Sequence, residues 1–490
     1  MSRRILIVAL CALAPFLRTP GAPADEGGRG GKGRGNAGGG GGGPGGPPWV
    51  FRTEVPAHDA DVVLGRPTRD SVTVSVRTTI DAEGCVEWRP AEAKEARRTP
   101  LRAYAKDTPV PSTLDGLTPD TAYVARLLTR RAPAEDLVPG EELSFHTQRA
   151  PGRAFTFTVQ ADSHLDAGTD PALYERTVRN VAGDRPDFHV DLGDTFMTDK
   201  HRDDFHAALP QYVAQRWYFG LARVPTFLVL GNHDGETGWR DRGTADDMPH
   251  WSNAQRKLLF PNPSPDGFYT GNEARDALNG LLENWYAFEW GDALFIALDP
   301  FWSTTHRKGR DADPWSWTLG DAQYRWLEKT LSTRRAKLRF VFIHHLVGGR
   351  GPEARGGAEV ARSFEWGGRS ADGKEEFAAR RPGFSAPIHD LLRKAGPTVV
   401  LHGHDHFFAH QELDGVVYQM VPQPGHAIGD AAKMAAEYGY LSGDFLSSPG
   451  HVRVRVAPDA ATVELVRSSK AGPAENGKVA FSYRVPTATR

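Results

Sequence analysis

The chain has 490 residues and a mass of 53.6 kDa, which is enough for about two or three domains. Its hydrophobic fraction of 39% and charged fraction of 24% are those of a folded globular protein, and they exclude global disorder and a polytopic membrane protein. The 59 Lys and Arg against 61 Asp and Glu give a formal net charge of -2, which argues against a protein that coats nucleic acid through bulk charge.

The N-terminus has the pattern of a signal peptide. Arg3 and Arg4 precede an apolar run over 5–13, and small residues at 22–24 offer a cleavage site. The apolar run is about half the ~20 residues that a membrane-spanning helix needs, and no later stretch is long enough. We therefore expect residues 1–24 to be removed, leaving a secreted, periplasmic or cell-surface protein without a transmembrane segment.

The next two regions differ sharply in composition. Residues 25–48 are dominated by glycine and are expected to form a disordered linker. Over 49–148, short segments with alternating apolar residues, such as 71–76, predict an all-β sandwich. The stretch from Leu114 to Tyr123 resembles the Leu-x-Pro-x-Thr-x-Tyr corner of fibronectin type III domains, in which the Tyr hydroxyl ties a strand to a loop. We interpret this domain as a positioning module without catalysis.

Residues 149–430 predict an α/β catalytic domain, because hydrophobic strands alternate there with helices and polar loops. Helices are expected over 171–182, where apolar residues recur at i, i+4 and i+7, and over 321–331, where they recur at i, i+3 and i+7. Over 431–490 the alternation over 451–456 predicts a β segment that completes or caps this domain.

Five predicted strands in the catalytic domain end on short polar motifs, and open α/β sheets place their sites at such carboxyl ends. The strands and the motifs that follow them are 155–160 with Asp162-Ser163-His164, 188–192 with Gly193-Asp194, 226–230 with Gly231-Asn232-His233-Asp234, 338–343 with His344-His345, and 398–401 with His402-Gly403-His404-Asp405-His406.

These motifs have the composition of a metal site. They hold 7 of the 18 histidines, a concentration that scattered surface histidines would not produce. Imidazole, carboxylate and amide ligands together suit Fe, Mn, Zn or Co rather than metals that prefer thiolates. The sequence therefore predicts a transition-metal site where the five strands end.

The ordered set of motifs resembles the calcineurin-like metallophosphoesterase superfamily over about 155–425. The resemblance implies a four-layer αββα sandwich of mixed sheets with two divalent or trivalent transition-metal ions. It also implies hydrolysis of phosphate mono- or diesters by a metal-activated hydroxide, since paired metals neutralise phosphoryl oxygens and supply a nucleophile at neutral pH.

The resemblance also implies a role for individual residues. One metal ion would be held by Asp162, His164 and His406, the other by Asn232, His344 and His404, and Asp194 would bridge them. His345 is an alternative to His344, because successive residues leaving a strand point opposite ways. His233 would stabilise the transition state or protonate the leaving group, with Asp234 fixing its tautomer. Metal ligation and a structural role remain alternatives for His233.

Purple acid phosphatases share the fibronectin-like N-terminal domain, but two positions here depart from that branch. It has Gly where this chain has His164, and a metal-binding Tyr where this chain has Met197. The tyrosinate that gives those enzymes their colour is therefore missing. The sequence indicates their architecture without membership of that branch.

The Arg- and Gly-rich stretch 348–383 is too long for an ordinary connection. It could be a lid that brings an arginine to a substrate phosphate, or a solvated surface insertion. The leading hypothesis for the whole chain is a hydrolase of small phosphate esters. A nuclease or cyclic-nucleotide phosphodiesterase on the same site is the alternative, although the near-neutral charge argues against a long nucleic acid. A non-catalytic extracellular binding protein is the third hypothesis.

Overall fold

The structure is a computed structural model that describes residues 49–133, 135–201, 204–306, 313–351 and 353–488. The predicted signal peptide (1–24) and linker (25–48) lie outside these residues. Among the helices that are described, none has the length and apolar character needed to cross a bilayer.

The N-terminal strands form two antiparallel sheets around a shared core that includes Val74 and Trp88. One sheet contains β1 (Ala60–Gly65), β2 (Val72–Thr78) and β6 (Val110–Leu114), and the other contains β3 (Ala82–Pro90), β4 (Arg97–Arg98), β5 (Arg102–Tyr104), β7 (Ala122–Arg130), β8 (Val138–Pro139) and β9 (Leu143–His146). The Tyr123 hydroxyl accepts a hydrogen bond from the Thr118 N–H at 2.9 Å, which is the strand-to-loop tie expected from the sequence. This strand-rich region is compatible with the predicted β-sandwich.

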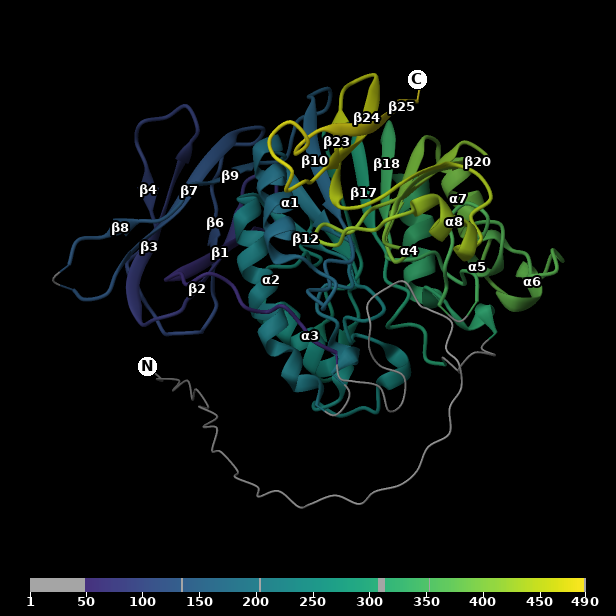
Figure 1. The fold of residues 1–490 in the computed structure, drawn as a ribbon, viewed down its shortest axis with the longest axis horizontal. Coiled ribbons are helices and arrows are strands. Elements are labelled where there is room, and N and C mark those ends of the chain that lie inside the picture. The colour runs from purple at the N-terminus through teal and green to yellow at the C-terminus, as the bar shows by residue number, and fades with distance from the viewer. Residues whose placement is uncertain (1–48, 134, 202–203, 307–312, 352, 489–490) are drawn as a thin grey trace, which may run out of the picture. The chain divides into compact units, whose positions relative to one another are not determined.

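The rest of the chain builds two larger mixed sheets (Figure 1). The six-stranded sheet has the order β12 (Thr226–Leu228), β11 (Phe188–Asp191), β10 (Phe155–Gln160), β23 (Gly450–Val456), β24 (Ala460–Arg467) and β25 (Val479–Pro486). The eight-stranded sheet has the order β13 (Thr270–Gly271), β16 (Tyr286–Trp290), β17 (Ala293–Ala297), β18 (Leu338–Phe342), β19 (Thr398–His402), β21 (Val416–Met420), β20 (Phe408–Leu413) and β22 (Asp444–Leu446). A small hairpin pairs β14 (Arg275–Asp276) with β15 (Gly280–Leu281).

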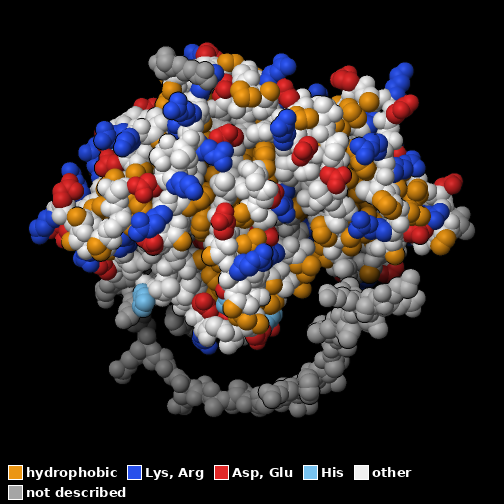
Figure 2. All heavy atoms as spheres, turned by 180° about the vertical axis from the view of Figure 1, so that it is seen from behind, with side chains coloured by type: hydrophobic (Ala, Val, Ile, Leu, Met, Phe, Trp, Pro, Cys, Tyr) orange, Lys and Arg blue, Asp and Glu red, His pale blue; other side chains and the backbone are white. Residues whose placement is uncertain are grey.

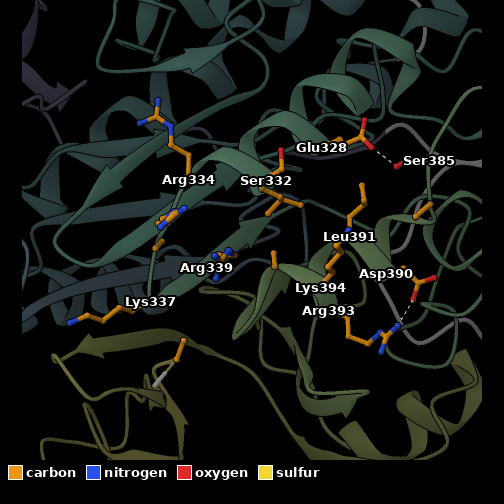
Figure 3. A pocket seen from close by; sticks show the side chains of 16 residues that line it. Glu328, Ser332, Arg334, Lys337, Arg339, Ser385, Asp390, Leu391, Arg393 and Lys394 are labelled. Atoms are coloured by element: carbon orange, nitrogen blue, oxygen red, sulfur yellow. Dashed lines mark hydrogen bonds and ion pairs between the residues drawn. The ribbon is translucent and has the colours of Figure 1, made fainter. Parts of the chain in front are cut away.

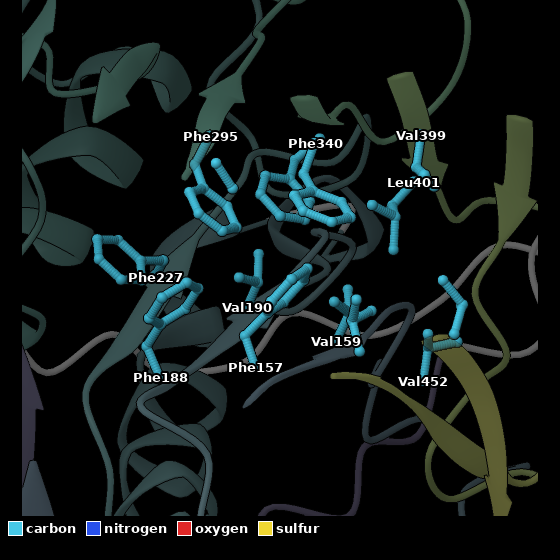
Figure 4. Close-up of a cluster of buried hydrophobic side chains, with 14 of the residues drawn as sticks. Phe157, Val159, Phe188, Val190, Phe227, Phe295, Phe340, Val399, Leu401 and Val452 are labelled. Carbon is cyan, nitrogen blue, oxygen red and sulfur yellow. The ribbon is translucent and has the colours of Figure 1, made fainter. Parts of the chain in front are cut away.

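A core rich in phenylalanine joins the inner faces of these two sheets (Figure 4). Phe157 of the six-stranded sheet meets Phe340 of the eight-stranded sheet edge to face, with ring centroids 4.8 Å apart. Phe188 and Phe295 meet in the same way at 5.2 Å. Each aromatic side chain of this size removes about 150–250 Å² from water, so the contact holds the two sheets in a fixed relation.

Helices cover the outer faces. Tyr174 and Val178 of α1 (Pro171–Asp184) pack with residues of α2 (Leu209–Ala222) on the side of the six-stranded sheet. On the eight-stranded side lie α4 (Gly320–Thr333) and α7 (Ile388–Ala395). The remaining helices are α3 (Met248–Leu259), α5 (Phe364–Gly367), α6 (Phe377–Arg380) and α8 (Ala431–Tyr438). The layers run helix, sheet, sheet, helix, which confirms the predicted fold class.

The C-terminal strands belong to the six-stranded sheet. β23 pairs antiparallel with β10, and β24 and β25 extend the sheet beyond it. The last strands of the chain therefore lie beside the strand that leads to the first polar motif, and they fix its position from the side opposite to β11.

A buried ion pair connects the N-terminal sheets to the catalytic domain. The Asp61 carboxylate on β1 accepts hydrogen bonds from Arg216 of α2 and, at 3.0 Å, from Arg77 of β2. Asp61 is 4% exposed, and Arg216 is fully buried.

We expect Asp61→Ala to lower the free energy of unfolding by about 3–5 kcal/mol, because the buried Arg216 charge loses its partner. Denaturant unfolding measures the loss. Asp107→Ala is the matched control, since Asp107 pairs with the same Arg77 but has a side chain that is 51% exposed, and it should cost less than about 1 kcal/mol. Equal losses for the two variants would contradict a special role for the buried pair.

Candidate metal centre

The seven proposed ligands follow five strands of the two facing sheets. Four of them follow β10, β11 and β12 of the six-stranded sheet, namely Asp162, His164, Asp194 and Asn232. The other three follow β18 and β19 of the eight-stranded sheet, namely His344, His404 and His406. Because β10, β11 and β12 are parallel, as are β18 and β19, their carboxyl ends open toward one edge.

One group of potential ligand atoms joins Asp162, His164 and His406. The Asp162 Oδ1 lies 3.6 Å from the Nε2 atom of each histidine. The ligand atoms of the three residues all lie within 4.8 Å of one another. The other oxygen of Asp162 accepts the His404 N–H at 2.8 Å, so Oδ1 is the oxygen that faces the two imidazoles.

A second group joins Asp194, His344 and His404. The His344 Nε2 lies 3.2 Å from both the Asp194 Oδ2 and the His404 Nδ1. The remaining ring nitrogens bond to backbone carbonyls, because the His344 Nδ1 lies 2.9 Å from the Leu192 oxygen and the His404 Nε2 contacts the Glu353 oxygen. Donation to those carbonyls leaves one lone pair on each imidazole directed at the site, which is the usual arrangement of a metal-binding histidine.

Asp194 lies between the two groups. Its Oδ2 is 3.2 Å from the His344 Nε2 and 4.0 Å from the His164 Nε2, so one carboxylate oxygen contacts both sets. Its Oδ1 accepts the His233 N–H at 2.8 Å. This position is the one that a bridging carboxylate requires.

Of the two neighbouring histidines after β18, His344 belongs to a ligand group and His345 belongs to neither, although its ring lies 5.1 Å from that of His404. The His345 ring packs against the rings of Trp317 and Phe301, with centroids 4.7 and 5.2 Å away, and its Nδ1 lies 3.0 Å from the Leu346 oxygen. The alternation of side chains along the chain explains why only one of the pair faces the centre.

Three of the proposed ligand atoms are buried with no hydrogen-bond partner in the described part of the chain: Asp162 Oδ1, His164 Nε2 and Asn232 Oδ1. Leaving a buried polar atom unpaired is costly, so such atoms call for a ligand. Asn232 stands between Gly231 and His233, and the His233 N–H bonds to the proposed bridging carboxylate. The residues present therefore fit the pair of metal ions that the sequence predicts.

The electrostatics of the site favour bound cations. Although burial favours the neutral ring, Asp162 and Asp166 raise the pKa of His164 to about 10, and Asp194 and Asp162 raise the pKa of His344 to about 9. Burial alone would raise the pKa of Asp194, but the neighbouring His344 and His233 hold it well below its usual value. The site therefore stabilises positive charge, and bound metal ions would take the place of the protons on His164 and His344.

Left-handed backbone concentrates at the proposed ligands. Five of them have positive φ: Asp162 (57°), His164 (37°), Asp194 (53°), His404 (77°) and His406 (74°). Non-glycine residues adopt such angles at a cost, which the surrounding structure must offset. Glycine is required where the loops touch, since a Cβ on Gly231 would lie 2.0 Å from the Asp194 nitrogen. The loops after β11 and β12 are thus packed backbone against backbone.

The structure corrects the partner expected for His233. The His233 Nδ1 lies 3.0 Å from the Asp199 Oδ1, so Asp199, and not Asp234, holds the ring. The Asp234 carboxylate turns inward and accepts four backbone N–H groups, from Gly231 (2.7 Å), Thr195 (2.8 Å), Phe196 (2.8 Å) and Asp194 (3.1 Å). Through these bonds Asp234 holds together the loops that carry Asn232 and Asp194. It does not reach the His233 ring, because the tight turn points neighbouring side chains in different directions.

Asp199 and Asp166 are the residues that sequence reasoning missed. Asp199 follows Asp194 by five positions in the same strand-end loop, and Asp166 follows His164 by two, with its Oδ2 3.4 Å from the His164 Nδ1. Both are carboxylates in loops that already carry a ligand. That proximity in the sequence was the signal that could have identified them as partners of the site's histidines.

The insertion 348–383 uses most of its arginines in ion pairs. Arg355 approaches the centre most closely, because it bonds at 2.8 Å to Asp405, the residue between His404 and His406. Four others pair with acidic groups: Arg362 with Asp414, Arg369 with Glu375, Arg380 with Asp313 and Arg381 with Glu365. These contacts favour a structural role for the insertion, in which Arg355 supports the fifth motif.

Comparisons with known proteins agree with this geometry. Residues 155–408 match the model of the calcineurin-like phosphoesterase family. Among solved structures, the chain is similar to that of PhoD, with a TM-score of 0.58 and 16% identity over 84% of this chain and 87% of that one. It is also similar to purple acid phosphatase PPD1 from yellow lupin (Lupinus luteus) seeds, with a TM-score of 0.56 and 16% identity over 87% and 74%. Likenesses at this identity show the fold. No curated protein matches the chain.

Proposed function

Because this chain belongs to the calcineurin-like phosphoesterase family and is a metal-dependent phosphoester hydrolase, we propose that it hydrolyses small phosphate mono- and diesters at a dinuclear centre of Fe, Mn, Zn or Co. The observation that carries the proposal is the pair of ligand groups joined by Asp194. Two bound metals would neutralise phosphoryl oxygens and activate water.

The residues around the centre have two different roles, proton transfer and support of the metal-binding loops. Asp199 holds the His233 Nδ1, which leaves the Nε2 to hold a proton and deliver it to the departing alkoxide. Asp234 does not touch the substrate in this scheme. It keeps the loops of Asp194 and Asn232 in register through its four backbone hydrogen bonds.

The surface supports a small substrate. On the face seen in Figure 2, basic and acidic side chains are interspersed rather than gathered into a stripe. Together with the net charge of -2, this argues against a long polyanion held along that face by bulk charge.

The test is a panel of phosphomonoesters, phosphodiesters, cyclic nucleotides and nucleic acids, assayed on protein whose metals have been analysed. Turnover of small esters with two equivalents of metal supports the proposal. Turnover confined to nucleic acid would replace it with the nuclease alternative, and inactivity of the metal-loaded enzyme toward every phosphoester would refute it.

The third testable outcome is spectroscopic and concerns Met197. This residue is buried and stands where purple acid phosphatases have their metal-binding Tyr. A thioether cannot supply the tyrosinate charge-transfer transition. Iron-loaded protein should therefore lack a strong visible band, as measured by absorption spectroscopy at known iron content, and a purple sample would contradict this expectation.

We also propose that the protein is exported, on the strength of the charged and apolar pattern over residues 1–24. Expression of the full chain, followed by N-terminal sequencing of the extracytoplasmic product, tests this. A mature N-terminus close to residue 25 supports export, whereas an intact N-terminus retained in the cytoplasm would refute it.

A further inference from the structure

A groove lies at the amino ends of β18 and β19, the strands that His344 and His404 follow. It has a volume of about 1300 Å³ and is lined by residues of α4, the start of β18 and α7. Arg339 pairs with Thr398 at the beginning of β19, whereas the proposed metal ligands follow the ends of β18 and β19. A five-residue strand spans about 16 Å, so the groove is separate from the metal centre.

The groove is strongly basic. Its cationic side chains are Arg334, Arg335, Lys337, Arg339, Arg393 and Lys394, against the two acidic residues Glu328 and Asp390. In Figure 3, Lys337 immediately precedes β18, Arg339 lies at the start of β18, and Leu391 and Lys394 come from α7. Three of the cations have acidic partners, since Arg334 pairs with Glu289, Lys337 with Asp292 and Arg393 with Asp390.

Arg339 is the unusual member of this set. It is only 5% exposed, and among the described residues its Nε has no hydrogen-bond partner. Within the described part of the chain, the side chains of Arg339, Arg335 and Lys394 form no ion pair. Arg339 lies on the face of β18 that is turned toward the helices. The next two residues on that face, Val341 and Ile343, are apolar and belong to the core. A buried guanidinium at such a position is expected only where an anion can reach it.

We propose that this groove is a second anion site, which takes an oligophosphate group through Arg339, with Arg335 and Lys394 at its rim. The planar guanidinium fork matches phosphate oxygens, and two further cations suit an anion of several charges. The oligophosphate can be free or attached to a nucleoside, and the apolar Leu391 beside the cations offers a surface to a nucleoside. The site is distinct from the proposed hydrolytic function and does not depend on it.

The experiment is calorimetric titration of the metal-loaded enzyme with methylenediphosphonate and with β,γ-methylene ATP, two probes whose carbon bridges resist hydrolysis. Arg339→Leu should weaken the groove's binding by about tenfold or more, because a charge-assisted hydrogen bond is lost. Metal content and kcat/KM for a small ester should stay as in the wild type. Arg325→Leu is the control, since it removes an exposed α4 arginine that pairs with Asp321 and does not line the groove.

Binding of the probes to the metal centre affects the wild type and the variants alike. The difference in affinity between the variants therefore reports binding in the groove. Similar affinity of both probes assigns the site to a free oligophosphate, and tighter binding of the nucleotide assigns it to a nucleoside-linked one. The proposal is overturned if Arg339→Leu binds both probes as the wild type does, or if Arg325→Leu shows the same loss. Should Arg339→Leu fail to fold, the double variant Arg335→Gln, Lys394→Gln applies the same test at the rim.

Discussion

Asp194→Asn should lower kcat/KM by about 10³-fold or more, a larger loss than substitution of any other single metal ligand. Asp194 contacts both ligand groups through one oxygen, so the loss of its charge weakens both metal sites together. Loss of about 4 kcal/mol of metal-dependent stabilisation corresponds to this factor. Elemental analysis of the purified variant should show less than the two equivalents of metal expected for the wild type.

Asp187→Asn is the matched control for this experiment. Asp187 is a buried carboxylate just before β11, whereas Asp194 follows the same strand, and it bonds to Arg149 and to the Trp290 indole. Its substitution should lower stability while leaving the metal content intact. An Asp194→Asn enzyme with two metals and full activity would remove the basis for a bridging role.

His233→Ala should keep its metals and lose about 10²- to 10⁴-fold in rate on esters with poor leaving groups, which is the usual range for general acid catalysis. The loss should be much smaller for a nitrophenyl ester, because that leaving group departs as a stable anion. The measurement is kcat/KM for an alkyl and a nitrophenyl phosphate, alongside metal analysis.

The neighbours of His233 make this test sharper. Asp199→Asn should show a weaker form of the same leaving-group dependence, since Asp199 acts through the His233 ring. Asp234→Asn should instead reduce turnover of both esters alike, because it loosens the backbone clamp on the metal loops. Equal losses on both esters in His233→Ala would reassign His233 to charge stabilisation, and loss of metal would make it a ligand.

Much of the fold and the meeting of the motifs could be predicted because both depend on local patterns. The predicted strand over 155–160 matches β10, and the expected helices over 171–182 and 321–331 match α1 and α4 to within two residues at each end. Parallel strands that end on polar motifs must bring those motifs to one edge, whatever the rest of the chain does. Family resemblance then supplied which metal each ligand would hold.

What could not be predicted depends on side-chain direction and on distant contacts. The turn from Gly231 to Asp234 decides that Asp199 reaches His233, and no periodicity encodes that choice. The carbonyl of Glu353, which orients His404, lies in an insertion 51 residues away, and Arg216 is 155 residues from Asp61. Such contacts follow from the path of the loops and the assembled layers rather than from any local signal.

The division of the proposed ligands between the two sheets has a consequence for how the protein matures. Asp162, Asp194 and Asn232 are synthesised well before His344, His404 and His406, and neither half alone offers a complete set. Metal capture would thus be a late event that succeeds only after both sheets have packed in the correct register. Once bound, ions at a thousandfold excess over their Kd would add about 4 kcal/mol against unfolding. Metal uptake would therefore occur only in correctly assembled protein, and a chelator would lower the stability of the protein as well as its activity.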